Sequence, residues 1–169
     1  MSFLLLGVIL FISCEKQPAP FTPDRQAGTE TVQMEQSDSE LLRIAEDARR
    51  TLPVFFQHLT RAGAGENNFC IKHPFKADNG AGFVMEQVWL TGIYFKNGEY
   101  YGILAGAPML ISGMEKGDTR TFDIEAITDW MYVRNGKITG GRSIKYLLEN
   151  IPENRRSDEQ RKILQMFEP

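Results

Sequence analysis

Residues 126–150, AITDWMYVRNGKITGGRSIKYLLEN, contain the pattern that decides the fold. Two strand-like runs flank Asn135-Gly136, a dipeptide typical of the tight type I′ turn of a β-hairpin. A Gly-Gly pair then separates the second run from IKYLLEN, which has helical character, and Ser143 is a candidate N-cap. The stretch therefore predicts a strand, a hairpin turn, a second strand and a short helix.

The same hairpin pattern extends toward the N-terminus of this stretch. Asn97-Gly98 marks a second type I′ turn. The run at 83–95 is apolar on both of its faces, which predicts that protein covers both sides of this strand. The strand-like runs in this region are NFCIKHPFKA, FVMEQVWLTGIYF, EYYGILAGAP and TRTFDI.

Helical spacing of apolar residues appears at both ends of this region. The segment 37–63 carries an apolar stripe at helical spacing, with Ser37 and Glu40 as a candidate capping box, and Pro53 is expected to kink or split this helix. Near the C-terminus, Ser157 and Gln160 form a second candidate capping box. The sequence thus predicts an α+β fold: an N-terminal amphipathic helix packed on a curved antiparallel sheet of about five to six strands, with short C-terminal helices.

The N-terminus has the pattern of an export signal. Residues 3–12 are uniformly apolar, but as a helix they would span roughly 15 Å, half of a bilayer core of about 30 Å. The following Phe-Ile-Ser-Cys sequence resembles a bacterial lipobox, which implies cleavage before Cys14 and acylation of its thiol; an ordinary secretory signal is the alternative. We therefore expect a lipoprotein signal peptide at 1–13, a flexible tether at 14–37 and a single α+β domain at 38–169.

This organisation predicts a protein of the cell envelope, held at a membrane by acylated Cys14. The net charge of −3 and the pI near 5.5 argue against a nucleic-acid partner. With Cys14 acylated, Cys70 is the remaining thiol, and we expect it to be buried. The sequence shows no cofactor motif, and no second Cys or His lies at metal-ligand spacing, so neither a cofactor nor a metal is predicted.

Two carboxylates stand out as candidates for chemistry. Asp129 follows a run that cannot keep strand alternation, so we expect it at a bend, where its side chain accepts local backbone N–H groups and Trp130 enters the core. The alternative is a ligand or partner surface built on Trp130 and Tyr132. Glu86 interrupts an apolar row and is either a pocket acid or a solvent-facing carboxylate at a strand edge.

Two further sequence patterns bear on possible chemistry. Cys70 and His73 are three residues apart on a strand, which places them on opposite faces and argues against a cysteine hydrolase. The run Gly140-Gly141-Arg142-Ser143 before a helix either cradles an anion or simply lets a strand turn into a helix.

Several of these motifs together resemble a YegJ-like bacterial family catalogued as a domain of unknown function. The resemblance covers residues 69 to about 150, and Ile127-Thr128-Asp129-Trp130-Met131-Tyr132 is its most specific element. It supports the α+β fold but implies no activity and no catalytic residues. The other matching pieces are FCIKHPF, Glu86-x-x-Trp89, Tyr101-Gly102-x-Leu104, Ala107-Pro108, Gly117-Asp118, Asn135-Gly136-Lys137, Gly140-Gly141 and the helix AEDARRTLPVFFQHL.

The leading hypothesis is a non-enzymatic, lipid-anchored envelope protein that binds a protein, such as a toxin, or a small ligand through an aromatic surface. The chain has more aromatic residues than one sheet face needs, including Tyr94, Tyr100 and Tyr101. The alternatives are a hydrolase-type enzyme with Glu86 or Asp129 as general base, and a structural envelope component. The candidate binding residues are Glu86, Trp89, Asp129, Trp130 and Tyr132.

Overall fold

The computed structural model describes residues 38–78 and 83–167 and confirms the predicted α+β class. The predicted signal peptide, the tether and Cys14 lie outside these residues. The elements in chain order are α2 (Ser39–Thr60), β1 (Glu66–Asp78), β2 (Phe83–Lys96), β3 (Glu99–Leu104), β4 (Thr119–Phe122), η1 (Ile124–Ala126), β5 (Asp129–Arg134), β6 (Lys137–Gly140), α3 (Arg142–Asn150), η2 (Glu153–Arg155) and α4 (Asp158–Met166).

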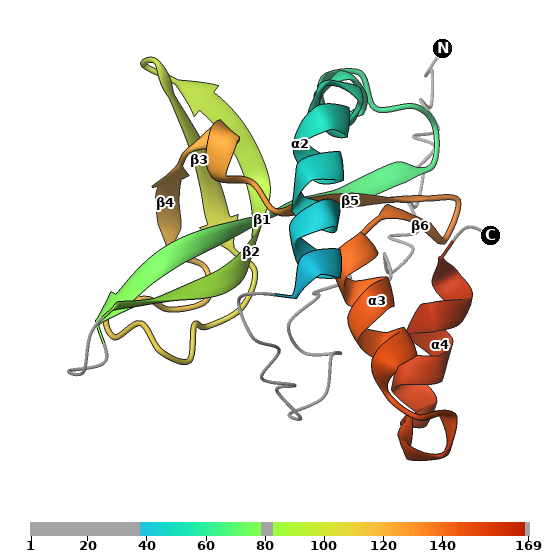
Figure 1. The fold of residues 1–169 in the computed structure, drawn as a ribbon. Helices are drawn as coiled ribbons and strands as arrows, with labels where there is room; N and C mark the ends of the chain where they lie inside the picture. Colours follow the sequence, from blue (N-terminus) through green and yellow to red (C-terminus); the bar gives the residue numbers. More distant parts are fainter. Residues whose placement is uncertain (1–37, 79–82, 168–169) are drawn as a thin grey trace, which may run out of the picture.

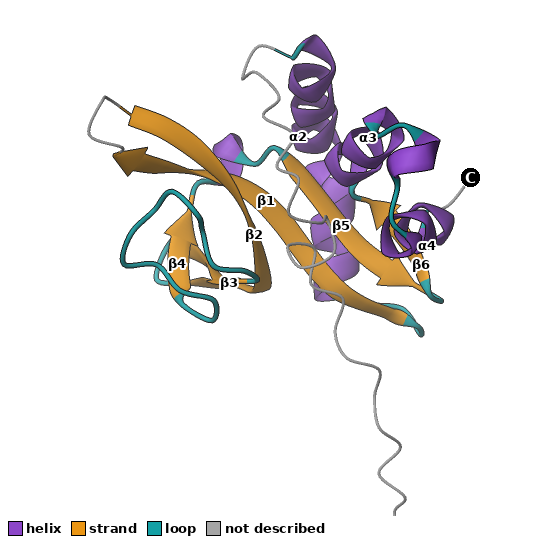
Figure 2. Cartoon of the chain, turned by 90° about the horizontal axis from the view of Figure 1, so that it is seen from below, coloured by secondary structure: helices purple, strands orange, loops and turns teal. Residues whose placement is uncertain are grey.

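The described strands form one antiparallel sheet in the order β4-β3-β2-β1-β5-β6 (Figure 1). Both Asn-Gly turns have positive φ at both residues: 53° and 87° at Asn97-Gly98, and 50° and 78° at Asn135-Gly136. This is the backbone signature of type I′ hairpins, so both turn predictions are confirmed. In Figures 1 and 2, the β3–β4 end of the sheet lies far from α3 and α4.

Two register shifts bend the sheet. One lies between Asn67 and Cys70 on β1, and the other between Thr91 and Tyr94 on β2. The second contains Gly92, where φ is +56° and a Cβ would lie 2.9 Å from the Ile103 side chain. An extra residue in one strand increases the local twist, which accounts for the predicted curvature.

Helix α2 begins one residue later than the predicted capping box implies. Asp38 is the N-cap, because its carboxylate accepts the N–H groups of Glu40 at 2.8 Å and Leu41 at 3.3 Å. The predicted Ser37 cap is therefore wrong, and Ser37 itself lies outside the described residues. The helix also continues through Pro53 as one element, so it is not split. A proline removes only its own N–H donor, and Leu52 and Phe55 beside it are buried in the core.

The sheet is covered on both faces, as the apolar pattern of β2 predicts. Val88 and Leu90 belong to the core beneath α2, whereas Trp89 belongs to the core beneath α3 and α4. Cys70 is 2 % exposed and lies in this second core, which confirms the expectation of a buried thiol. The α4 capping box of Ser157 and Gln160 is also confirmed.

The β6 edge of the sheet is shielded by neighbouring groups. At β6, Phe167 forms a parallel bridge with Ile138, and Lys137 Nζ donates to the Gln165 carbonyl at 2.9 Å. Such shielding disfavours pairing with another chain. Among the described helices, none has the length and apolar character needed to cross a membrane.

Candidate functional site

Asp129 is almost fully buried, with 2 % of its surface exposed, at the start of β5. Its Oδ1 accepts the N–H of Trp130 at 2.8 Å, which confirms the predicted local hydrogen bond. Its Oδ2 accepts the N–H of Ser143 at 2.8 Å, a contact that sequence reasoning missed. The bend before β5 is made by η1, whose N-cap is Asp123, so the prediction that Asp129 itself forms the corner is wrong. One carboxylate therefore joins β5 to the first turn of α3.

Helix α3 has no side-chain cap of its own. Its N-cap is Gly141 at φ +63°, not the predicted Ser143, which lies inside the first turn. Asp129 supplies the missing acceptor, and a negative charge is favoured at a helix N-terminus. The N–H that would hold an external anion in the Gly140–Ser143 run is thus occupied by the protein's own carboxylate. Gly140 permits this turn, because a Cβ there would lie 2.2 Å from the Trp130 carbonyl oxygen.

Lys72 completes the polar cluster around Asp129. Its ammonium donates to Ser143 Oγ at 3.2 Å and lies 5.8 Å from the centre of the Trp89 ring. Burial raises the pKa of the Asp129 carboxyl, and hydrogen bonds from Ser143 and the charge of Lys72 oppose that rise. Ser143 is only 4 % exposed and Lys72 is half-buried, so the three polar groups form a largely buried network rather than an open catalytic site.

The rings proposed as an aromatic surface lie in the interior. Trp130 is 9 % exposed, and its indole N–H lies 3.2 Å from the Ala48 carbonyl and 3.1 Å from Thr51 Oγ1 on α2. Tyr132 is stacked on Phe69 at a centroid distance of 5.1 Å. Trp89 is likewise buried, on the other face. A binding surface built on Trp89, Trp130 and Tyr132 is therefore wrong, because the helices that cover the sheet seal these rings.

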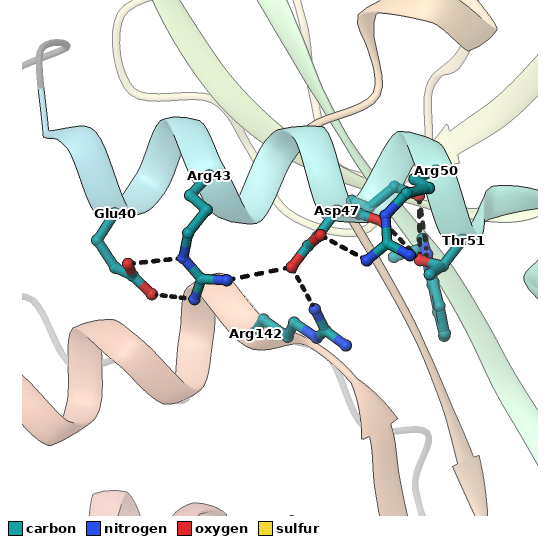
Figure 3. A network of polar contacts seen from close by, with 8 residues as sticks. Glu40, Arg43, Asp47, Arg50, Thr51 and Arg142 are labelled. Carbon is teal, nitrogen blue, oxygen red and sulfur yellow. Dashed lines mark hydrogen bonds and ion pairs between the residues drawn. The ribbon is translucent and has the colours of Figure 1, made fainter.

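An ion-pair network joins α2 to α3 beside this core. Figure 3 shows Arg43, Arg50 and Arg142 directed at Asp47. The Asp47 carboxylate lies 3.2 Å from the guanidinium of Arg43, 2.7 Å from that of Arg50 and 2.9 Å from that of Arg142. Tyr146 on α3 also donates to the Asp38 carboxylate at 3.0 Å. These exposed contacts orient α3 against α2, although each exposed pair adds little stability.

Glu86 does not converge with Asp129. The Glu86 carboxylate accepts the N–H groups of Met109 at 2.6 Å and Leu110 at 2.8 Å, so it holds the segment 105–118 between β3 and β4. In the sheet, Glu86 pairs with Phe75 whereas Asp129 pairs with Lys72. Positions 72 and 75 on β1 point to opposite faces, because strand side chains alternate. The hypothesis of a catalytic site that combines both carboxylates is therefore wrong.

His73 is 8 % exposed and lies on the face opposite Cys70, as predicted. Its Nε2 accepts the N–H of Asp123 at 3.3 Å, and its Nδ1 has no hydrogen-bond partner. Burial lowers the pKa of the ring, partly opposed by the charge of Asp123. Within residues 38–78 and 83–167, no group of three or more His, Cys, Asp or Glu side chains is arranged to hold a metal ion.

Accessible aromatic rings gather instead near the turn of the β2–β3 hairpin. Phe95 is 61 % exposed and Tyr94 is 44 % exposed. Tyr94 stacks on Tyr101 with centroids 5.2 Å apart and an interplanar angle of 7°, and Phe95 contacts Tyr100 at 4.8 Å. The two pairs lie on opposite faces of the hairpin, because consecutive strand side chains alternate, and we call these four residues together the hairpin aromatic cluster. Tyr94, Tyr100 and Tyr101 were among the surplus aromatic residues seen in the sequence, but none was predicted as a site.

A pocket of about 200 Å³ lies between α2 and η1. It adjoins the hairpin aromatic cluster, because the Phe56 ring lies 5.5 Å from Tyr100. The sequence did not predict the pocket, since η1 was not recognised and its α2 wall was interpreted only as part of the apolar face of the helix. Its lining residues are Arg49, Leu52, Pro53, Phe56, Ile124 and Glu125.

These observations define a single-sheet α+β domain whose buried acid is structural and whose accessible rings lie at one hairpin. The chain belongs to the bacterial family described as "Uncharacterized protein conserved in bacteria (DUF2314)", whose model matches residues 38–164. The resemblance inferred from the Ile127–Tyr132 motif is thereby confirmed.

Two curated relatives share part of the chain. A putative ankyrin repeat protein, NMB1133/NMB1171, from Neisseria meningitidis serogroup B (strain ATCC BAA-335 / MC58) is 30% identical over 129 residues, which cover 74% of this chain and 51% of the relative. The uncharacterized protein YegJ of Escherichia coli (strain K12) is 32% identical over 106 residues, which cover 63% of this chain and 65% of YegJ. The chain thus spans less than two thirds of either relative. No solved structure gives a significant match.

The first prediction concerns Asp129. In Asp129→Asn, the single amide oxygen can accept only one of the two buried N–H groups, and the amide nitrogen faces the other. We expect a loss of about 1–3 kcal/mol in the free energy of unfolding, measured by urea denaturation. Asp158→Asn, which removes an exposed first-turn charge of α4 and its ion pair with Arg161, is the matched control and should cost less than about 1 kcal/mol. An Asp129→Asn variant as stable as the wild type would contradict the structural role.

The second prediction concerns pH. Because burial lowers the pKa of His73 below its ordinary value of 6.5, the neutral ring contributes stability that is present above pH 6.5. This contribution is lost as the pH falls through the lowered pKa. We expect urea denaturation at pH 7.5 and 5.0 to show a larger loss for the wild type than for His73→Gln, whose amide can still accept the Asp123 N–H. Equal pH dependence of wild type and His73→Gln would refute the assignment.

Proposed function

We propose that the protein is a non-enzymatic, lipid-anchored domain of the bacterial cell envelope that binds a partner protein through the hairpin aromatic cluster. The observation that carries the proposal is the exposure of Tyr94 and Phe95 on opposite faces of one hairpin, each packed against a half-buried tyrosine of β3. The family and the relatives described above bear names that state no activity of this domain.

The arrangement of the rings favours binding. Large aromatic side chains contribute much contact area at a low cost in side-chain entropy, and they are enriched in the residues that dominate binding energy. Stacking of Tyr94 on Tyr101, together with the hydrogen bond from the Tyr101 hydroxyl to Glu99 at 2.8 Å, restrains these rings before any partner arrives. The exposed rings of Tyr94 and Phe95, each packed against a tyrosine of β3, are therefore better suited to recognition than the isolated apolar residues on α2, such as Leu42.

The anchor rests on the sequence Phe-Ile-Ser-Cys before the tether. Acylation of Cys14 would hold the domain at a membrane, and residues 14–37 would leave it free to meet a partner at that surface. An envelope protein or a toxin entering the envelope fits this placement. The acids considered as general bases are both engaged by backbone N–H groups, so the enzyme hypothesis has no comparable support.

The third prediction tests the surface and the anchor. A photo-cross-linking phenylalanine analogue placed at Phe95 should give one discrete protein adduct in intact cells. The same analogue at Leu42, an exposed apolar position on α2, is the matched control and should give none.

In the same cells, Cys14→Ser should move the protein out of the membrane fraction. Adducts that are absent at position 95, or identical at both positions, would refute the binding surface; a membrane-bound Cys14→Ser protein would refute the anchor.

A further inference from the structure

The pocket between α2 and η1 has the size of a single amino-acid side chain. Its volume of about 200 Å³ exceeds that of an engineered cavity of roughly 150 Å³ that binds benzene. It is smaller than typical sites for drug-sized ligands, which measure about 300–1,000 Å³. Leu52, Pro53, Phe56 and Ile124 provide apolar walls. Such a half-open space accommodates a branched aliphatic group.

Two opposite charges complete the lining. Arg49 is half-buried, and its Nη1 donates to the Ile127 carbonyl at 3.3 Å, which holds the guanidinium next to η1. Glu125 is exposed, and its backbone N–H is fixed by the Asp123 carboxylate at 2.9 Å. Within the described part of the chain, Arg49 and Glu125 do not form an ion pair with each other. Both charges therefore remain available to a ligand.

We infer that this pocket binds a free apolar α-amino acid of the size of leucine. The aliphatic side chain occupies the space between Leu52, Phe56 and Ile124, where it is removed from water. The α-carboxylate pairs with the guanidinium of Arg49, and the α-ammonium pairs with the carboxylate of Glu125. Charge-assisted hydrogen bonds of this kind are stronger than neutral ones.

The pair of opposite charges selects a zwitterion over simpler ligands. A carboxylate without an ammonium group would leave Glu125 unpaired and close to a like charge. An amine without a carboxylate would meet Arg49 in the same way. A ligand that lacks one of the two charged groups therefore loses one favourable contact and also meets a repulsive charge.

This inference goes beyond the proposed function, since it concerns a different set of residues. The fourth prediction follows from it. The full chain carrying Cys14→Ser is titrated with L-leucine, 4-methylpentanoate and 3-methylbutylamine, and the amide chemical shifts of Ile124 and Glu125 are followed by NMR. We expect L-leucine to bind at least about tenfold more tightly than either analogue, the difference that corresponds to 1.4 kcal/mol.

Substitutions inside and outside the pocket test which residues bind L-leucine. Arg49→Gln and Glu125→Gln should each weaken L-leucine binding by about tenfold. Arg50→Gln and Glu46→Gln, at neighbouring α2 positions outside the pocket, are the controls and should bind as the wild type does. Thermal unfolding confirms that each variant is folded, and Glu125→Gln provides an independent test if Arg49→Gln unfolds.

The inference is overturned if L-leucine binds no more tightly than the two analogues, or if both pocket variants bind as the controls do. A negative result leaves the proposed function unaffected, because cross-linking at Phe95 does not depend on Arg49 or Glu125.

Discussion

The carboxylate of Asp129 accepts one N–H from β5 and one from α3, and the arrangement of the C-terminal half depends on these two bonds. Gly141 turns the chain out of β6 without a side-chain cap, so α3 takes its missing acceptor from the neighbouring strand. Lys72 supplies the compensating charge from β1. With α3 fixed in this way, α3 and α4 cover the second core and seal Trp89 inside it.

Helix α2 has the corresponding role on the other face. Its backbone and Thr51 accept the indole N–H of Trp130, which satisfies the one polar group of a buried ring. Because the helices cover both faces over β1, β2 and β5, most aromatic residues belong to the two cores. The hairpin aromatic cluster lies where this cover ends, and it is therefore where rings such as Phe95 remain accessible. The rings that stabilise the domain and the rings proposed for recognition therefore lie in different parts of the same sheet.

Local sequence patterns predicted much of the fold and little of the site. The Asn-Gly turns, the Ser157–Gln160 capping box and the apolar faces of β2 depend on neighbouring residues, so the sequence shows them directly. Other contacts join segments that are distant in the sequence, so no local pattern predicts them. These are the hydrogen bonds that Asp129 accepts from Ser143 and that Glu86 accepts from Met109 and Leu110. Trp130 and Phe95 look alike in an alternating pattern, because burial is decided by helices that pack from elsewhere in the chain. The pocket was missed for the same reason, since one wall is η1.

We assign the Ile127–Tyr132 motif to holding the domain together and propose that binding uses accessible groups elsewhere. Amide hydrogen exchange at Ser143 tests this assignment most directly. If Asp129 holds the first turn of α3, the Ser143 N–H should exchange only on global unfolding, with the same protection as the N–H of Met131 in the core of β5. Exchange at Ser143 as fast as at an exposed, frayed helix end would contradict the account.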